Sequence, residues 1–231
     1  MGRHPLDNPA WHALTGPHAA VALGAGLARH YPRDMAPFSA VAEATPAAYA
    51  DLARDLPPGL EARLLRPAEE APPPGWAVVS ARPLRQMVAD AASLAGPHPA
   101  EDGLVALGPG DAADMLALAE AAKPGPFGPH TGALGRFLGR RGPDGRLLAM
   151  AGERFRFAGH VELCTICVHP DARGRGLGAA ATLRLAREAL ARGEAPFLLV
   201  LADNPAAALY ARLGFRERAT TWILWHRPVP P

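Results

Sequence analysis

Three glycines alternate with larger residues between a predicted strand and a predicted helix, and they constrain this chain more than any other feature. The segment is Arg173-Gly174-Arg175-Gly176-Leu177-Gly178. Such spacing lets the backbone approach a ligand closely and directs successive N–H groups into one concavity. The positive end of the following helix faces the same place, and Arg173 and Arg175 can add charge-assisted contacts to phosphate oxygens. The segment therefore predicts a binding site for a phosphate or pyrophosphate.

Two nucleotide-binding motifs compete for this segment, and the context excludes both. Gly174, Gly176 and Ala179 match the permissive dinucleotide fingerprint, and Glu194 lies at a suitable distance beyond them. However, residues 169–172 separate the glycines from the strand, and too little chain follows for a βαβ series. A P-loop requires Gly-Lys-Ser/Thr, which is absent from the segment.

The residues around the loop predict a regular order of strands and helices. Hydrophobic patterning predicts strands at 103–107, 135–141, 146–154, 160–168 and 196–201, with two closing strands from residue 215. It predicts helices at 111–122, after the glycine segment to about residue 192, and after Asn204, with Asn204 as N-cap and Pro205 in the first helical position. The order is β, α, β-hairpin, β, α, β, α, β, β.

The first hundred residues predict a separate α+β portion. Residues 46–56 have helical spacing, and residues 76–80 and 84–88 predict two short strands separated by Pro83. We therefore divide the chain into residues 1–100 and 101–231. Whether the first portion supplies a wall of the site or is a degenerate half-repeat of the second is left open.

Two motifs in the second portion resemble the signatures of the GNAT N-acetyltransferases. Residues 168–178, which contain the glycine loop, resemble the acyl-CoA signature, and residues 204–215, which include Asn-Pro-Ala-Ala-Ala-Leu-Tyr-Ala-Arg-Leu-Gly-Phe, resemble the second signature. The order of elements is also that of the superfamily, and the resemblance covers roughly residues 101–231. It implies an α/β (α+β) fold with a mixed, mostly antiparallel central sheet that splays where the cofactor binds.

The resemblance also implies acetyl-CoA as co-substrate and a set of residues that bind it. Backbone groups of three strand residues are expected to bind the pantetheine arm, and loop amides and arginines the pyrophosphate. Asn204 is expected to contact the cofactor as well. The strand residues are Ile166, Cys167 and Val168, and the loop residues are Arg173, Gly174, Arg175, Gly176, Leu177, Gly178 and Ala179.

Transfer of an acyl group to an amine requires a base for the ammonium and an acid for the leaving thiolate. Glu162 lies where the histone acetyltransferase branch has its general base, and it can equally be a strand glutamate that faces solvent or pairs with an arginine. Glu153 on the neighbouring strand is a substitute candidate. Tyr210 matches the tyrosine that protonates the thiolate in the superfamily.

These residues predict an acetyl-CoA-dependent N-acetyltransferase that transfers the acetyl group directly to a primary amine. The acceptor is a small-molecule or peptide amine, which the sequence does not identify further. The alternative is an acyl-CoA-binding sensor or interaction module with weak or no catalysis. It arises because Tyr210 lies six residues after Asn204, where relatives commonly show seven.

Composition and charge indicate the compartment of the protein and exclude some classes of partner. A net charge of +2 offers no field that would gather nucleic acid, and no apolar run is long enough to span a bilayer. Two cysteines fit a reducing compartment, so we expect a cytoplasmic protein. A homodimer is compatible with the sequence. Strand alternation places Cys164 and Cys167 on opposite faces, so no metal is implied.

Overall fold

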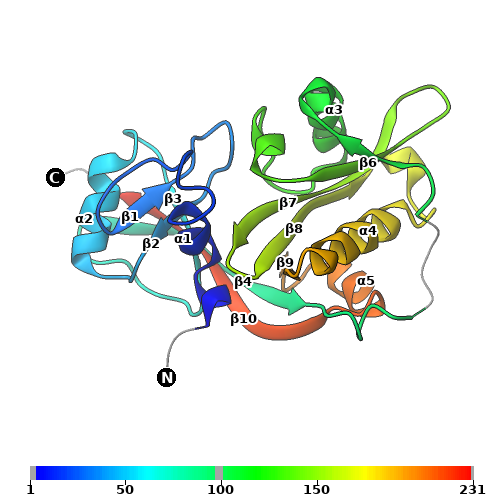
Figure 1. Ribbon diagram of the computed structural model, residues 1–231. Coiled ribbons are helices and arrows are strands. Elements are labelled where there is room, and N and C mark those ends of the chain that lie inside the picture. Colours follow the sequence, from blue (N-terminus) through cyan, green and yellow to red (C-terminus); the bar gives the residue numbers. More distant parts are fainter. Residues whose placement is uncertain (1–3, 97–100, 230–231) are drawn as a thin grey trace.

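The fold is built around one twisted sheet, described by a computed structural model over residues 4–96 and 101–229 (Figure 1). The helices are α1 (Pro9–Leu14), α2 (Pro46–Asp55), α3 (Ala112–Ala122), α4 (Leu177–Ala191) and α5 (Ala206–Arg212). The strands are β1 (Ala28–His30), β2 (Ser39–Val41), β3 (Ala62–Arg66), β4 (Trp76–Val88), β5 (Leu104–Leu107), β6 (Phe137–Arg141), β7 (Leu147–Phe157), β8 (His160–Val168), β9 (Ala195–Leu201) and β10 (Arg216–Pro228).

The main sheet has eight strands in the order β3-β10-β4-β9-β8-β7-β6-β5, and β1 and β2 form a separate pair. Only β8 and β9 pair in parallel among the described strands; the other ladders are antiparallel. The structure therefore confirms the mixed, mostly antiparallel sheet. It also confirms the predicted helix near 46–56 and the order of elements from β5 to α5, with boundaries shifted by one to three residues at most ends.

Two predictions about strands are wrong. The segments 76–80 and 84–88 form one strand, β4, in which Pro83 is tolerated. The carbonyl of Pro83 accepts a hydrogen bond from the Ala202 amide, just beyond the last paired residue of β9. The side of Pro83 that lacks an N–H therefore faces the end of the β4–β9 ladder. The second correction concerns the C-terminus, where residues from 216 form the single long strand β10.

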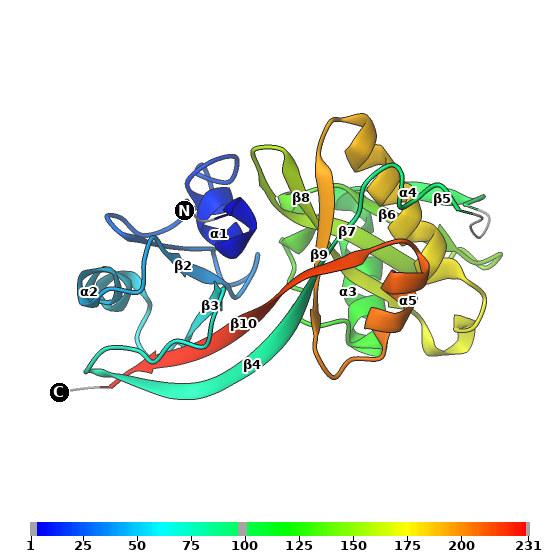
Figure 2. The same cartoon turned by 90° about the horizontal axis from the view of Figure 1, so that it is seen from below.

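The strand that completes the sheet beside β10 comes from the first hundred residues. β4 lies between β9 and β10 and pairs with both (Figure 2). Figure 2 also shows β4 and β10 running together from the half that carries α5 to the half that carries α2. The sheet is thus continuous across the predicted boundary near residue 100, and the division into two domains stays a prediction.

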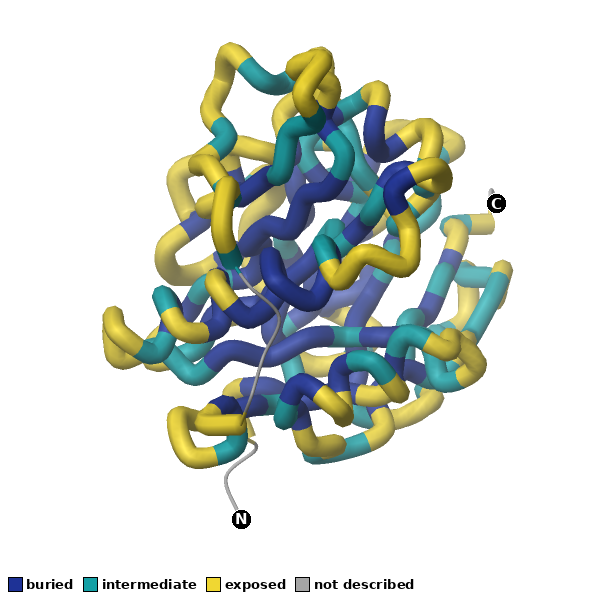
Figure 3. Tube along the Cα trace, turned by 90° about the vertical axis from the view of Figure 1, so that its right-hand side faces the viewer, coloured by how far each residue is buried: buried dark blue, intermediate teal, exposed yellow. Residues whose placement is uncertain are grey.

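The helices cover the sheet on both faces. α4 and α5 pack on one face around Leu183, Leu198 and Tyr210, whereas α3 covers the other face at Phe137 and Met150. α1 packs beside Phe155, Phe197 and neighbouring apolar residues. The chain trace is buried in the centre of the molecule and exposed in the outer loops (Figure 3).

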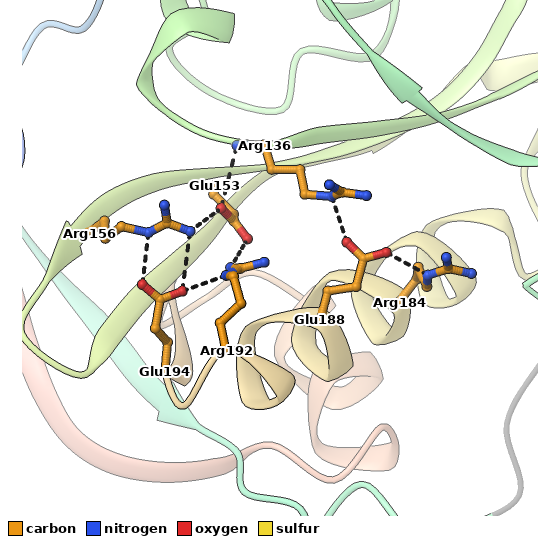
Figure 4. Close-up of polar contacts among 7 residues, drawn as sticks. All are labelled: Arg136, Glu153, Arg156, Arg184, Glu188, Arg192 and Glu194. Atoms are coloured by element: carbon orange, nitrogen blue, oxygen red, sulfur yellow. Dashed lines mark hydrogen bonds and ion pairs between the residues drawn. The ribbon is translucent and has the colours of Figure 1, made fainter.

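A network of charged side chains fastens the end of α4 to β7 (Figure 4). The carboxylate of Glu153, which is 1% exposed, accepts hydrogen bonds from Arg156 at 3.1 Å and from Arg192 at 2.5 Å. Glu194 binds both arginines, at 2.9 and 2.8 Å. Because Glu153 is buried, its charge depends on these partners.

Replacing Glu153 with glutamine is expected to destabilise the fold by roughly 2–3 kcal/mol. This is less than for a fully buried pair, because the side chains of Arg156 and Arg192 are 37% and 34% exposed. The melting temperature should fall by roughly 4–12 °C. Glu217→Gln is the matched control, since its pair with Arg85 spans 3.6 Å with both side chains more than 40% exposed. A loss of about 0.5 kcal/mol or less is expected there. Equal melting temperatures for the two variants would contradict a stabilising role of the network.

Candidate active site

The parallel strands β8 and β9 separate after one short paired segment, and a cavity opens between them. In the described part of the chain, their pairing covers only residues 160–162 of β8 and 195–197 of β9. Beyond that point a cavity of about 720 Å³ is lined by residues of both strands, of α5 and of the segment after α3. The splay predicted from the resemblance is therefore present.

The glycine loop lies at one end of this cavity. Gly174 and Gly176 have φ angles of 78° and 75°, a conformation that a side chain would strain, and Gly176 is the N-cap of α4. Gly178 lies against β8, where a Cβ atom would approach Val168 Cγ2 to 3.2 Å. The first amides of α4 have no partner within the helix and remain available to an anion.

The loop residues differ in their relation to the cavity. Arg173 and Gly178 line it, whereas the guanidinium of Arg175 donates to the backbone carbonyl of Asp171 at 3.2 Å. Ile166, Cys167 and Val168 line it from β8. Contacts to the cofactor by Gly174, Gly176, Leu177 and Ala179 stay predictions.

A bulge in β8 changes the direction of the side chains that follow it. Thr165 and Ile166 together oppose Ala151, and Thr165 has a φ of 50°, which is rare for a β-branched residue. As a result, Leu163 and Ile166 both pack toward α4, although they are three residues apart.

Because of this bulge, Cys164 and Cys167 lie on the same face of β8. Cys167 packs with the residues of α3, on the face opposite to Leu163 and Ile166. The prediction that the two cysteines face opposite ways is wrong, since simple alternation holds only for a regular ladder. Both thiols are free, and burial raises the pKa of Cys164 to about 11 and that of Cys167 to about 12. Neither thiol is a ready nucleophile near neutral pH.

Tyr210 reaches the cavity from α5. Its side chain is 8% exposed and its ring packs edge-on against Phe215, with the centroids 6.4 Å apart. Burial raises the pKa of Tyr210 to about 12, helped by the nearby thiols of Cys164 and Cys167. The phenol is therefore protonated throughout the physiological range.

The start of α5 differs slightly from the prediction. The helix begins at Ala206 with Pro205 as its N-cap, one residue later than expected. Asn204 still caps the turn, because its Oδ1 accepts a hydrogen bond from the Ala206 amide at 2.9 Å, and it lines the cavity. Asp203 pairs with Arg82 at 2.8 Å.

Glu162 lies in the cavity wall and is held by an arginine. Its two carboxylate oxygens accept hydrogen bonds from Arg154 Nε and Nη2, both at 2.8 Å, and the side chain is 1% exposed. Burial is the largest single influence on Arg154 and opposes its charge, but Glu162 together with Cys164 and Tyr31 raises the pKa of the guanidinium. Arg154 also stacks over Phe38 at 4.4 Å.

The pairing of β7 with β8 explains how Arg154 meets Glu162. A second irregularity sets Arg154 and Phe155 of β7 opposite Glu162, which gives the arginine a direct approach to the carboxylate. Of the two interpretations of Glu162, the structure shows the pairing with an arginine. Glu162 also lies in the cavity wall, and its role as a base stays a prediction. Glu153, the substitute candidate, does not line the cavity and is bound in the network of Figure 4.

The sequence did not reveal which residues of the first hundred would reach the cavity. Phe38, Arg63, Leu65, Arg82 and Leu84 line it. They carry no motif. The insertion of β4 and the pairing of β3 with β10 bring four of them to the cavity, and Phe38 comes from the segment before β2. Lys123-Pro124-Gly125-Pro126, after α3, forms a further wall.

Residues 4–96 and 101–229 lack two features that would suggest other functions. They contain no group of three or more His, Cys, Asp or Glu side chains that could hold a metal ion. Nor does this part of the chain contain a helix long and apolar enough to cross a membrane.

Comparison with known proteins agrees with this geometry. Residues 140–223 match the family described as FR47-like protein. The crystal structure of a GNAT-family protein from Novosphingobium aromaticivorans shares 39% sequence identity and superposes with a TM-score of 0.86, over 99% of this chain and all of that one. No curated protein matches the sequence significantly.

More distant structures share the fold. A GCN5-related N-acetyltransferase from Kribbella flavida is 23% identical, with a TM-score of 0.64 over 96% of this chain and 95% of that one. A tandem GNAT protein from the clavulanic acid biosynthesis pathway is 21% identical, with a TM-score of 0.58 over 90% and 80%.

The mostly antiparallel sheet that splays between β8 and β9, with the glycine loop at the start of α4, is the fold of the GNAT acetyltransferases. With a relative 39% identical over its whole length, the chain belongs to the GNAT family of acetyltransferases.

Proposed function

We propose that the protein is an acetyl-CoA-dependent N-acetyltransferase that transfers the acetyl group directly to a primary amine. The observation that carries the proposal is that Gly178, Tyr210 and Glu162 all line the same cavity between β8 and β9. The two sequence motifs and the predicted acid and base thus border one space, although they come from different elements.

The residues of the slot fit the cofactor. A Cβ atom at Gly178 would close the approach to β8, so this glycine keeps room for a ligand beside Ile166 and Val168. Backbone groups of residues 166–168 would bind the pantetheine arm, and the amides of residues 174–179 would hold the pyrophosphate. Arg173 lines the slot and Arg175 lies beside it, so both can neutralise phosphate charge.

The bound cofactor supplies an activated acetyl thioester, and the chain supplies the proton transfers. Glu162 takes a proton from the acceptor ammonium, which makes the nitrogen nucleophilic. Tyr210 gives its phenolic proton to the departing sulfur, and its raised pKa keeps that proton available. Because both cysteines are protonated at neutral pH, direct transfer is favoured over an acyl-enzyme.

Thermal unfolding with acetyl-CoA tests the cofactor assignment, with NAD and ATP as controls. Ligand at a hundred times its dissociation constant should stabilise the fold by about 2.7 kcal/mol, a shift of very roughly 5–11 °C for a chain of this size. Arg173→Gln should reduce the shift, whereas Arg227→Gln, at an exposed position of β10 outside the cavity, should leave it unchanged.

The same experiment separates the alternatives. No shift with acetyl-CoA, or a shift with NAD instead, would contradict the cofactor. A shift without thiol release on any amine would instead support the sensor module that the short Asn204–Tyr210 spacing suggests. A cytoplasmic setting, the absence of nucleic acid partners and a homodimer stay predictions.

A further inference from the structure

The cavity extends well beyond the cofactor slot into an apolar chamber. Its walls are Phe38, Leu65, Leu84, Leu201, Ile223 and Trp225. They come from β3, β4, β9, β10 and the segment before β2. The chamber adjoins Glu162 and lies away from the glycine loop in sequence and in strand order, so it is the space left for the acceptor.

Three arginines line this part of the cavity, and two of them are neutralised by the protein. Arg154 is bound to Glu162 and Arg82 to Asp203, each at 2.8 Å. Arg63 makes no ion pair within the described residues, and its Nε is buried without a hydrogen-bond partner. Among the described residues, Arg63 is thus the arginine of the chamber that has no ion-pair partner.

The surroundings of Arg63 favour an anionic ligand. Its guanidinium carbon lies 4.1 Å from the ring centroid of Trp225, which fixes the plane of the group while leaving its N–H donors to a partner. Burial and the charge of Arg33 lower the pKa of Arg63, and Glu61 offsets this only in part. A guanidinium with an unsatisfied donor in an apolar chamber matches a carboxylate, which also balances its single charge.

The sheet order sets the shape of the acceptor. Arg63 lies on β3 and Glu162 on β8, four positions away in the sheet. At ~4.8 Å per strand this separates the two strands by about 19 Å, so the two side chains cannot both contact a molecule whose amine and carboxylate are on neighbouring carbons.

We propose that the acceptor is an elongated amine that carries a carboxylate at the far end of an apolar body, and that Arg63 on Trp225 binds this carboxylate. The inference rests on the proposed N-acetyltransferase function. It makes Arg63 a specificity residue and gives the first hundred residues a role in choosing the acceptor.

The test compares amines of equal chain length in a thiol-release assay with acetyl-CoA. 8-Aminooctanoate has the amine and carboxylate at opposite ends, octylamine lacks the carboxylate, and 2-aminooctanoate has both groups at one end. We expect kcat/KM for 8-aminooctanoate to exceed that for each of the others by about 10-fold or more, as a charge-assisted contact provides. 8-Aminooctyl phosphate tests the alternative anion, and a preference for it would overturn the carboxylate.

The variant Arg63→Gln should lower kcat/KM for 8-aminooctanoate by about 10-fold more than kcat/KM for octylamine, which removes the advantage of 8-aminooctanoate. Arg227→Gln, which lies outside the cavity, should behave as the wild type, and melting temperatures report whether each variant is folded. Equal rates for 8-aminooctanoate and octylamine in the wild type would overturn the inference, as would an Arg63→Gln loss that is the same for both.

A binding measurement separates this inference from the proposed function. If 8-aminooctanoate shifts the melting temperature in an Arg63-dependent way without thiol release, the anion site stands and the transferase proposal falls. If octylamine is acetylated as fast as 8-aminooctanoate, the transferase stands and the anion site falls. If none of these amines binds or reacts, the inference is wrong.

Discussion

Replacing Tyr210 with phenylalanine is expected to lower kcat by about 100-fold or more while leaving the thermal shift with acetyl-CoA unchanged. The ring keeps its packing against Phe215, and only the proton donor is lost. Because burial raises the pKa of this phenol to about 12, the wild-type residue holds its proton over the whole accessible pH range. The measurement is steady-state thiol release with a saturating amine.

A leaving group that needs no proton sharpens the test of Tyr210. With an acetyl thioester of an acidic aromatic thiol, the deficit of Tyr210→Phe should shrink, since that thiolate departs unprotonated. Tyr49→Phe is the matched control, because Tyr49 is also buried, its hydroxyl is hydrogen-bonded to His226 Nδ1 at 2.8 Å, and it does not line the cavity. Turnover of Tyr210→Phe within twofold of the wild type would remove the residue from the acid role.

Replacing Glu162 with glutamine is expected to cause two separate losses. Turnover at pH 7 should fall by about 100-fold or more if the carboxylate takes the ammonium proton. This deficit should shrink as pH rises toward the pKa of the amine, because the acceptor then loses its proton without help. Stability should fall by about 3 kcal/mol, since Arg154 is left buried without its counter-ion.

The double variant Arg154→Met with Glu162→Leu separates the chemistry of Glu162 from its structural role. It removes both charges at similar volume, so most of the lost stability should return. If Glu162 is the base, turnover stays low although the fold is restored. A deficit that is independent of pH, or activity that returns with the melting temperature, would identify Glu162 as a structural ion-pair partner only.

Local patterns were sufficient for much of residues 101–231. The glycine loop, the Asn204–Phe215 motif and the apolar stripe of α4 are each contiguous stretches of sequence, and each gives its element a distinctive spacing. The family, the mostly antiparallel sheet and the splay between β8 and β9 followed from them and are confirmed.

Side-chain direction on β8 was not accessible from these patterns. The bulge at Thr165 and Ile166 depends on how β8 pairs with β7, and one extra residue exchanges the two faces of the strand. This is why Cys164 and Cys167 share a face against the prediction. The same ladder, through its second irregularity, brings Arg154 to Glu162.

By itself, the sequence determined the class of protein and the position of the glycine loop before α4, because those depend on neighbours along the chain. Only the tertiary structure decided which residues line the cavity. β4 enters the sheet between β9 and β10, and β3 follows at its edge, through pairings between residues more than a hundred positions apart. Such pairings leave no local periodicity, since any strand with a suitable apolar face can make them. They place Arg63 over Trp225 in a cavity that no single segment encodes.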